Sequence, residues 1–382
     1  MRKEEKIKAA IVGCGMISDI YMQNLTGPQA RFQVIDLVAC CDMRLEAAQS
    51  KAEKYGIKVM TLEEICADTE IQIVINLTTP GAHYPVIKQL LNAEKNVYTE
   101  KILSVHLKEA EELVALATEK NLYLGAAPDT FLGSGIQTAR QLVDAGLIGE
   151  VTSCHASVNR DYNLMAEKVP FVTKLGGGIG FDVGIYYMTA LLSILGPVKT
   201  VSGFMKTNKP NRKHFLLKND NFGEEYQVES ENVMVGSMLF ESGVAGTIHF
   251  NSESIMNEQA QLILYGTQGI LFVGNPDQFG AEVKLLRNGE TEAIVVPQNH
   301  GYSENSRGLG VAEMAWSIKA GRKNRANKDM ALNALEALHG IAISSENGTH
   351  YELKSTFERP AALPQGYVYK PGVHSDEEVA LV

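Results

Sequence analysis

The feature that most constrains the fold is a run of short apolar segments that alternate with amphipathic ones as far as Ala126. The apolar segments predict strands over residues 7–13, 34–42, 59–60, 71–77, 96–100 and 123–126. The segments between them predict helices over 16–25, 45–55, 62–67, 83–93 and 107–120. Strands that alternate with helices of this length are typical of parallel βαβ units. The pattern therefore predicts a six-stranded, doubly wound parallel sheet.

The pattern changes near Pro128, where longer strands separated by turn residues begin. We expect helices over 135–145, 181–195, 310–321 and 330–347, a strand over 151–160, and several strands between 198 and 296. This favours an α/β chain with three parts. They are a Rossmann domain over 1–128, an α+β domain with a large, mostly antiparallel open sheet over 129–360, and a C-terminal tail over 361–382.

A glycine-rich turn joins the first expected strand to the first helix, with the sequence Gly13-Cys14-Gly15-Met16-Ile17-Ser18. Such a turn needs Gly13 for tight curvature and Gly15 so that a pyrophosphate can approach the backbone and the helix N-terminus. Asp42 ends the second strand, where a carboxylate can bind ribose hydroxyls and repel a 2′-phosphate. Together these residues predict dinucleotide binding, with NAD favoured over NADP. Arg44 is close enough to Asp42 to leave NADP open.

Composition narrows the class of protein further. The 382 residues include 35 Lys+Arg and 45 Asp+Glu, a net charge of −10, which disfavours nucleic-acid or anionic-membrane binding through the whole surface. No apolar run reaches the ~18 residues of a membrane span, and no signal peptide is evident. The five cysteines contain no C-x-x-C pair, which favours reduced thiols and a cytoplasmic protein. No metal-ligand spacing occurs, so we expect no metal site.

Three stretches resemble the Gfo/Idh/MocA family of nicotinamide-dependent sugar and polyol dehydrogenases. They are Ala10–Ser18, Ile75–Lys101 with its Thr99-Glu100-Lys101, and Gly176–Tyr186 with its Asp182-Val183-Gly184-Ile185-Tyr186. The resemblance extends from about Lys8 to Pro364. It implies a Rossmann domain followed by a domain whose open sheet often forms the oligomer interface, and hence a homodimer or homotetramer.

The resemblance also implies a catalytic lysine, which matches Lys101. Ile102 stands where the family usually has Pro, and Tyr186 stands where it usually has a catalytic His. Tyr186-Tyr187 resembles a branch of the family with paired tyrosines. We therefore assign proton transfer to Lys101, with a pKa expected to fall from ~10.4 toward ~7–8 through burial and a positive nicotinamide. Asp182 and Tyr186 are i, i+4 on one helix face and are expected to complete the site.

Further contacts are implied at lower specificity. Residues expected along the cofactor are Thr78, Thr79, Pro80 and His83, and Glu100 is expected near the nicotinamide ribose. His83 is also a candidate for a structural role. Residues expected near the substrate are Asp129 and Arg160.

The function expected from this pattern is oxidation of a secondary hydroxyl of a sugar, glycoside or cyclic polyol with NAD(P). Two alternatives stay open. One is an NAD-dependent, redox-neutral glycosidase, which would cleave a glycoside without net NADH. The other is a non-catalytic NAD-binding regulator, suggested by Ile102 and by the missing histidine.

Overall fold

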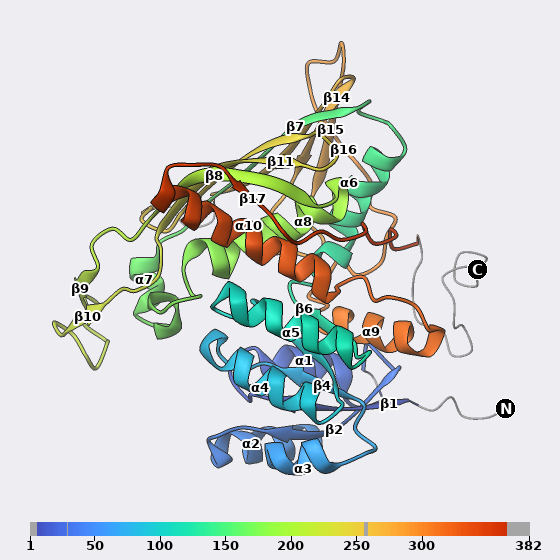
Figure 1. Cartoon of the computed structure of the whole chain (residues 1–382), viewed down its shortest axis with the longest axis vertical. Coiled ribbons are helices and arrows are strands. Elements are labelled where there is room, and N and C mark those ends of the chain that lie inside the picture. Colours follow the sequence, from blue (N-terminus) through green and yellow to red (C-terminus); the bar gives the residue numbers. More distant parts are fainter. Residues whose placement is uncertain (1–5, 29, 256–258, 365–382) are drawn as a thin grey trace.

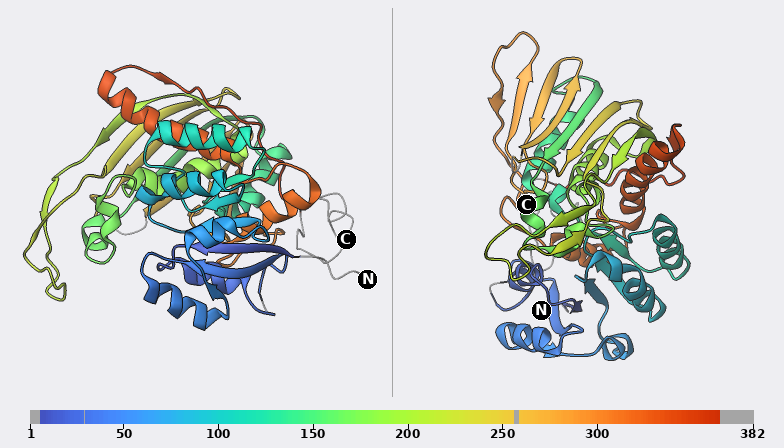
Figure 2. Two further views of the ribbon diagram at one scale, coloured as in Figure 1. Left: turned by 60° about the horizontal axis from the view of Figure 1, so that its bottom comes forward. Right: turned by 90° about the vertical axis from the view of Figure 1, so that its left-hand side faces the viewer.

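A computed structural model describes residues 6–28, 30–255 and 259–364, which form two lobes (Figures 1 and 2). In the lower lobe of Figure 1, six parallel strands lie in the order β3-β2-β1-β4-β5-β6. The strands are β1 (Ile7–Val12), β2 (Ile35–Cys41), β3 (Lys58–Val59), β4 (Ile73–Asn76), β5 (Asn96–Thr99) and β6 (Leu124–Ala126). This order is that of a Rossmann fold, so the expected doubly wound sheet is confirmed.

The helices of this lobe follow the expected alternation. They are α1 (Ser18–Leu25), α2 (Leu45–Tyr55), α3 (Leu62–Ala67), α4 (Pro80–Asn92) and α5 (Leu107–Glu119). Local signals fix their ends: Thr61 and Glu64 form a capping box at the start of α3, and Gly56 ends α2 in the left-handed region. α4 begins three residues before the predicted start at His83, because Thr79 is extended and Pro80 occupies the first helical position.

The upper lobe contains a nine-stranded sheet in the order β16-β15-β14-β13-β7-β12-β11-β8-β17. Its strands are β7 (Val151–Asn159), β8 (Val198–Lys206), β11 (Val233–Phe240), β12 (Ala245–Asn251), β13 (Gln259–Gly266), β14 (Gly269–Val273), β15 (Val283–Arg287), β16 (Ile294–Val295) and β17 (Tyr351–Glu352). Neighbouring strands are antiparallel except β7 and β12, so the expected mostly antiparallel sheet is confirmed. A small hairpin of β9 (Asn211–Lys213) and β10 (Glu225–Gln227) projects from this lobe (Figure 2, left).

Among the described residues, the helices of this lobe lie on one side of the sheet (Figure 1). α6 (Ser134–Asp144) and α10 (Lys328–Asn347) pack against the strands, and α8 (Ile185–Leu195) packs against both helices. α8 is buried along its whole length. The predicted helix over 181–195 is wrong in its first turn, because Gly180–Gly184 forms a wider π-turn ahead of α8.

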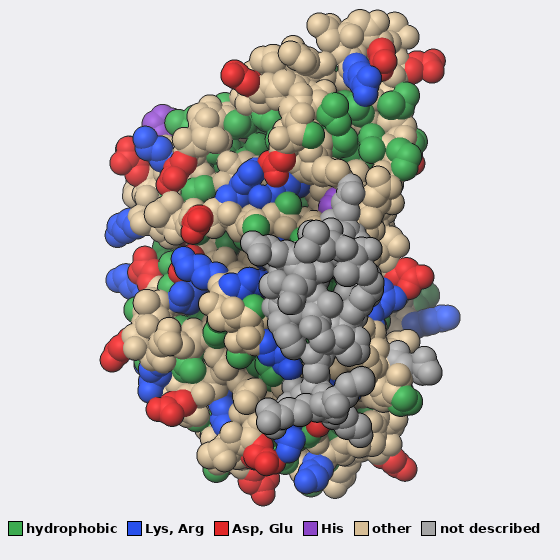
Figure 3. Space-filling model, turned by 90° about the vertical axis from the view of Figure 1, so that its right-hand side faces the viewer, with side chains coloured by type: hydrophobic (Ala, Val, Ile, Leu, Met, Phe, Trp, Pro, Cys, Tyr) green, Lys and Arg blue, Asp and Glu red, His purple; other side chains and the backbone are tan. Residues whose placement is uncertain are grey.

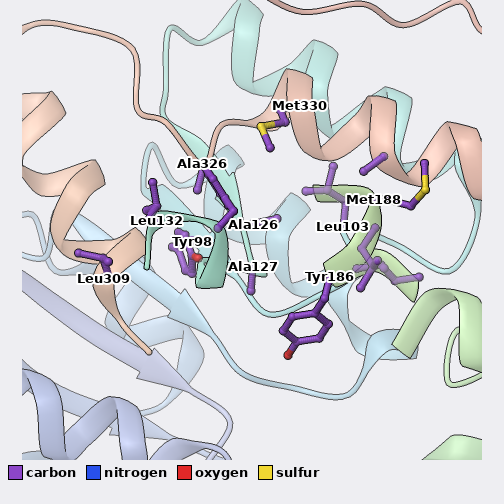
Figure 4. Close-up of a cluster of buried hydrophobic side chains, with 14 of the residues drawn as sticks. Tyr98, Leu103, Ala126, Ala127, Leu132, Tyr186, Met188, Leu309, Ala326 and Met330 are labelled. Atoms are coloured by element: carbon purple, nitrogen blue, oxygen red, sulfur yellow. The ribbon is translucent and has the colours of Figure 1, made fainter. Parts of the chain in front are cut away.

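The two lobes share a continuous core. α9 (Leu309–Ala320) and α10 run back against β6, and Gly125 forms a bridge with Asn327. Gly310 lies so close to Tyr98 that an added Cβ would be 2.3 Å from the phenol oxygen. Figure 4 shows buried side chains from both lobes in one cluster, which fixes the position of one lobe against the other.

Several expectations about composition can be compared with the described residues. All five cysteines are free thiols. In the described part of the chain, no helix is long and apolar enough to cross a membrane, and no group of three or more His, Cys, Asp or Glu could hold a metal ion. Acidic and basic side chains are interspersed on the face drawn in Figure 3.

Candidate active site

The glycine-rich turn after β1 has one glycine required by packing and one that faces open space. Gly13 has φ +102°, and an added Cβ would lie 2.6 Å from the Leu77 carbonyl carbon. An added Cβ at Gly15 would have no atom within 4 Å. No neighbouring atom of the protein would clash with a side chain at Gly15. The open space beside Gly15 is instead what the close approach of a dinucleotide to the backbone needs. The residues present therefore fit an NAD-type cofactor.

Asp42 lies at the rim of this turn. Its Oδ2 accepts a hydrogen bond from the Cys14 N–H at 2.7 Å, and its Oδ1 accepts from the Arg44 N–H at 2.8 Å. The Arg44 side chain is exposed. Asp42 therefore shapes the turn as well as presenting a carboxylate beside it.

Asp19 places a second carboxylate in the first turn of α1, where it could repel a phosphate. Lys51 and Lys54 of α2 both bind this carboxylate and hold its pKa well below the ordinary range. Two ammonium groups of α2 thus offset the charge of this carboxylate.

The turn after β4 borders the same edge of the sheet. The Asn76 Oδ1 accepts from the Thr78 hydroxyl at 2.7 Å, and the Asn76 Nδ2 donates to Thr99 Oγ1 at 3.1 Å. Thr78 and Pro80 are half-buried, and Thr79 is exposed. Their predicted contact with the cofactor stays a prediction, although parallel strands bind ligands at this edge.

His83 lies inside the protein. It is fully buried, and its ring nitrogens lie against the carbonyl oxygens of Thr78 (3.0 Å) and Ile102. Burial lowers the pKa of His83. The expectation that His83 contacts the cofactor is therefore wrong; the ring fixes the turn after β4 to the segment after Lys101. The Lys101–Ile102 peptide bond is cis.

Glu100 is also engaged inside the protein. Its Oε1 accepts from the Tyr21 hydroxyl at 2.8 Å, and its Oε2 accepts from the Lys101 N–H at 3.1 Å. The carboxylate thus links α1 to the end of β5.

Lys101 and Asp182 form the centre of the site. The Lys101 ammonium makes an ion pair with Asp182 Oδ1, and the Tyr162 hydroxyl donates to Asp182 Oδ2 at 2.6 Å. The Lys101 side chain is 18% exposed, whereas that of Asp182 is 5% exposed. The ammonium also lies 5.8 Å from the Phe171 ring centroid and 5.9 Å from that of Tyr186. Lys101 is thus fixed from several sides and is the more exposed group of this pair.

Opposing effects act on the pKa of Lys101. Burial lowers the pKa of Lys101, but the charge of Asp182, the Tyr186 hydroxyl and the charge of Glu100 outweigh burial and raise it above the ordinary lysine value. The counter-ion thus stabilises the ammonium more than burial destabilises it. The predicted fall toward neutral pH also depends on the positive charge of a bound nicotinamide and stays a prediction.

Tyr186 points its hydroxyl out of the buried cluster and away from the other labelled side chains (Figure 4). Arg307 donates to this hydroxyl at 3.4 Å and pairs with Asp277 at 2.9 Å. Arg160 also pairs with Asp277, at 3.3 Å. Burial raises the pKa of Tyr186, against the charges of Lys101 and Arg307, so its phenol is neutral at neutral pH.

Asp129 has a structural position instead of the expected one beside the substrate. It is 1% exposed, and its Oδ2 accepts from the N–H groups of Gly308 and Gly310 at 3.1 and 2.9 Å. Burial raises the pKa of Asp129 to about 6. The carboxylate caps the start of α9.

Comparison with known proteins agrees with this geometry. Residues 7–127 match the oxidoreductase family with an NAD-binding Rossmann fold, and residues 136–272 match the GFO/IDH/MocA C-terminal domain. The chain belongs to the Gfo/Idh/MocA family. The recognition drawn from the sequence is confirmed.

Relatives of this Gfo/Idh/MocA chain are distant. It is 28% identical over 206 residues to an uncharacterized oxidoreductase of Schizosaccharomyces pombe, covering 53% of this chain and 55% of that protein. It is 24% identical over 362 residues to the scyllo-inositol 2-dehydrogenase (NADP(+)) of Bacillus subtilis, covering 90% and 95%. The matches to the first three curated relatives span only a little over half of those proteins.

A solved structure shows the same fold. The aldose-aldose oxidoreductase from Caulobacter crescentus complexed with glycerol superposes with a TM-score of 0.76 at 19% identity, covering 91% of this chain and 100% of that one. At this identity the likeness concerns the fold.

Four site residues of this family member were missed by the sequence analysis. Tyr162, Asp277 and Arg307 lie on three separate segments, and no motif marks them. Glu231 is 5% exposed and accepts from the Gly180 N–H at 2.8 Å, so it caps the π-turn that carries Asp182. A Cβ at Gly178 would lie 2.0 Å from the Glu231 carboxylate, so the glycine-rich segment makes room for this side chain.

Proposed function

We propose that this protein is an NAD-dependent dehydrogenase acting on a secondary hydroxyl of a sugar, glycoside or cyclic polyol. The observation that carries the proposal is the Lys101–Asp182 pair at the carboxyl end of β5, on the same edge of the sheet as the glycine-rich turn. The neighbouring aromatic rings and hydroxyls suit a carbohydrate. The inositol dehydrogenase among the relatives, which acts on a cyclic polyol, supports the same class.

The chemistry divides between cofactor and protein. When bound, the nicotinamide supplies the acceptor for the hydride that leaves the substrate carbon. In the oxidation, Lys101 as the neutral amine accepts the proton of the reacting hydroxyl, and in the reverse reduction its ammonium returns that proton. Its side chain is the more exposed member of the Lys101–Asp182 pair. Asp182 fixes that ammonium, Tyr162 fixes Asp182, and the neutral Tyr186 donates a hydrogen bond to the substrate.

NAD is the proposed cofactor, with NADP open. The partly buried Asp42 carboxylate beside the turn disfavours a 2′-phosphate, whereas the exposed Arg44 side chain could accept one. Asp42→Ala should reduce the ratio of NAD to NADP affinity about tenfold or more, measured by titration of both cofactors.

The open face of the upper sheet is the proposed contact with a second copy of the chain. Phe204 is 65% exposed and Leu239 is 41% exposed on neighbouring strands of this face, and Thr247 and His249 are further exposed positions on it. An exposed apolar sheet face of this kind is typical of an interface. Light scattering after size exclusion should give a dimer or tetramer, and Phe204→Glu should weaken it.

Activity is tested by following NADH absorbance with purified protein, NAD or NADP, and a panel of D-glucose, D-xylose, myo-inositol, uronic acids and aryl glycosides. NADH formation with one class supports the proposal and identifies the substrate class. Release of aglycone without NADH would instead establish the redox-neutral glycosidase. Cofactor binding without either reaction would contradict the dehydrogenase.

A further inference from the structure

We propose that Arg307 and Asp277 form a second hydroxyl-binding subsite, so that the substrate is a polyol recognised through two hydroxyls and not through the reacting one alone. This rests on the proposed function and specifies the feature of the substrate that the site selects, a second hydroxyl. The two residues belong to segments that no motif marked.

The subsite lies beside the Tyr186 hydroxyl. Arg307 bridges Asp277, at 2.9 Å, and the Tyr186 hydroxyl, at 3.4 Å. The Tyr186 ring also faces the Lys101 ammonium, 5.9 Å from its centroid. The phenol therefore connects the ammonium that holds the reacting oxygen to the Arg307–Asp277 pair.

Both members of the pair are partly open to solvent. The Arg307 side chain is 16% exposed and that of Asp277 is 25% exposed, whereas the nearby Asp129 and Glu100 are engaged by backbone N–H groups or by Tyr21. A guanidinium donates only and a carboxylate accepts only. A sugar hydroxyl does both, so adjacent donor and acceptor groups suit one or two neighbouring hydroxyls of a polyol.

The interaction should strongly favour substrates that carry the second hydroxyl. A substrate lacking it would lose its hydrogen bonds to the two charged groups, which stay paired with each other and, for Asp277, with Arg160. Hydrogen bonds to charged groups are worth about 1.5–3 kcal/mol. Conversion gives a loss of about 10- to 100-fold in kcat/KM.

The experiment is a substrate–variant cycle. D-glucose, D-xylose and myo-inositol are each compared with their monodeoxy analogues, using the wild-type protein, Arg307→Gln, Arg307→Lys and Asp277→Asn. For one analogue that keeps the reacting hydroxyl, the wild type should lose about 10- to 100-fold in kcat/KM. Relative to the wild type, Arg307→Gln and Asp277→Asn should lose a similar factor in kcat/KM on the parent compound but show little further loss on that analogue. Arg307→Lys should restore part of the loss on the parent compound.

Arg31→Gln is the matched control. Arg31 binds Ser306 at 2.7 Å and Glu304 at 2.6 Å, so it contacts the loop that carries Arg307 without contacting the Arg307–Asp277 pair. It should not change the ratio between parent and analogue. Melting temperatures check that each variant is folded.

The possible outcomes separate the two proposals. If NADH forms but the Arg307 and Asp277 variants lose the same factor in kcat/KM on the parent compound and on the analogue, the subsite is overturned and the dehydrogenase stands. If no compound is oxidised, calorimetric binding of the same compounds to the wild type and Arg307→Lys decides. Binding that is weakened by removal of one hydroxyl and by the variant supports the subsite; binding that ignores both overturns it.

Discussion

Lys101 and Asp182 form an ion pair between the two lobes, joining the end of β5 to the π-turn ahead of α8. The carboxylate is buried, and it raises the pKa of the lysine above its ordinary value against the effect of burial. The pair therefore decides both where the ammonium lies and at what pH it can accept a proton.

Removing the carboxylate should move the pH dependence of oxidation. Oxidation needs Lys101 as a neutral amine, so the wild-type rate should rise as the pH approaches the raised pKa. Asp182→Asn leaves burial, which lowers the pKa of Lys101, without the opposing charge. The midpoint of kcat/KM against pH should therefore fall by about 1–3 pH units. An unchanged midpoint would show that Lys101 is not the titrating group.

Tyr162 should affect catalysis without affecting the fold strongly. Tyr162→Phe removes the 2.6 Å hydrogen bond to Asp182 and frees that carboxylate to rotate. We expect kcat to fall about 5- to 30-fold, from a lost bond worth about 1–2 kcal/mol. Tyr55→Phe is the control, because it removes a 2.9 Å hydroxyl–carboxylate bond to Asp19 away from the site. Equal steady-state kinetics for Tyr162→Phe and wild type would contradict the positioning role.

The two glycines of the turn should separate folding from cofactor binding. Gly13→Ala places a Cβ 2.6 Å from backbone at a positive φ, so we expect a loss of folding stability of about 2 kcal/mol or more. Gly15→Ala meets no atom of the protein, so stability should change little while the Kd for NAD rises at least tenfold. Thermal melting and NAD titration measure the two effects. An unchanged Kd in folded Gly15→Ala would mean that no cofactor approaches there.

Asp129 should be a stability residue with a pH signature. Asp129→Ala removes the cap of α9 and should cost about 1–3 kcal/mol of unfolding free energy, and Asp129→Asn less. The raised pKa of about 6 means that the folded state binds the proton more tightly than the unfolded state. The contribution of Asp129 to stability is thus largest below the unfolded pKa and is lost as pH rises toward 6. The advantage of the wild type over Asp129→Asn should accordingly shrink between pH 4 and 7 in denaturant titrations.

The sequence predicted the parts of this protein that local patterns specify. Alternating apolar segments determine the order of strands and helices, and the turn at Gly13 and Gly15 has a steric cause that one sequence reveals. Lys101 and Asp182 were found through family motifs, and the structure shows their direct contact.

Long-range contacts could not be predicted in the same way. Arg307 meets Tyr186 across 121 positions, and Tyr162 meets Asp182 from a five-residue helix that no periodicity marks. The role of Asp129 could not be decided from the sequence, because a polar residue after a strand suits a cap and a ligand equally well. The net shift in the pKa of Lys101 could not be predicted, because it depends on the balance between burial, the Asp182 charge and the charge of a bound nicotinamide.

The most direct test of the account is NADH formation by Lys101→Met, a variant of similar length without the charge. With the best substrate of the panel, kcat should fall at least 1,000-fold, roughly the loss of a positioned proton-transfer group, while the Kd for NAD stays within about threefold. A variant that binds NAD and retains wild-type kcat would contradict the assignment of proton transfer to Lys101.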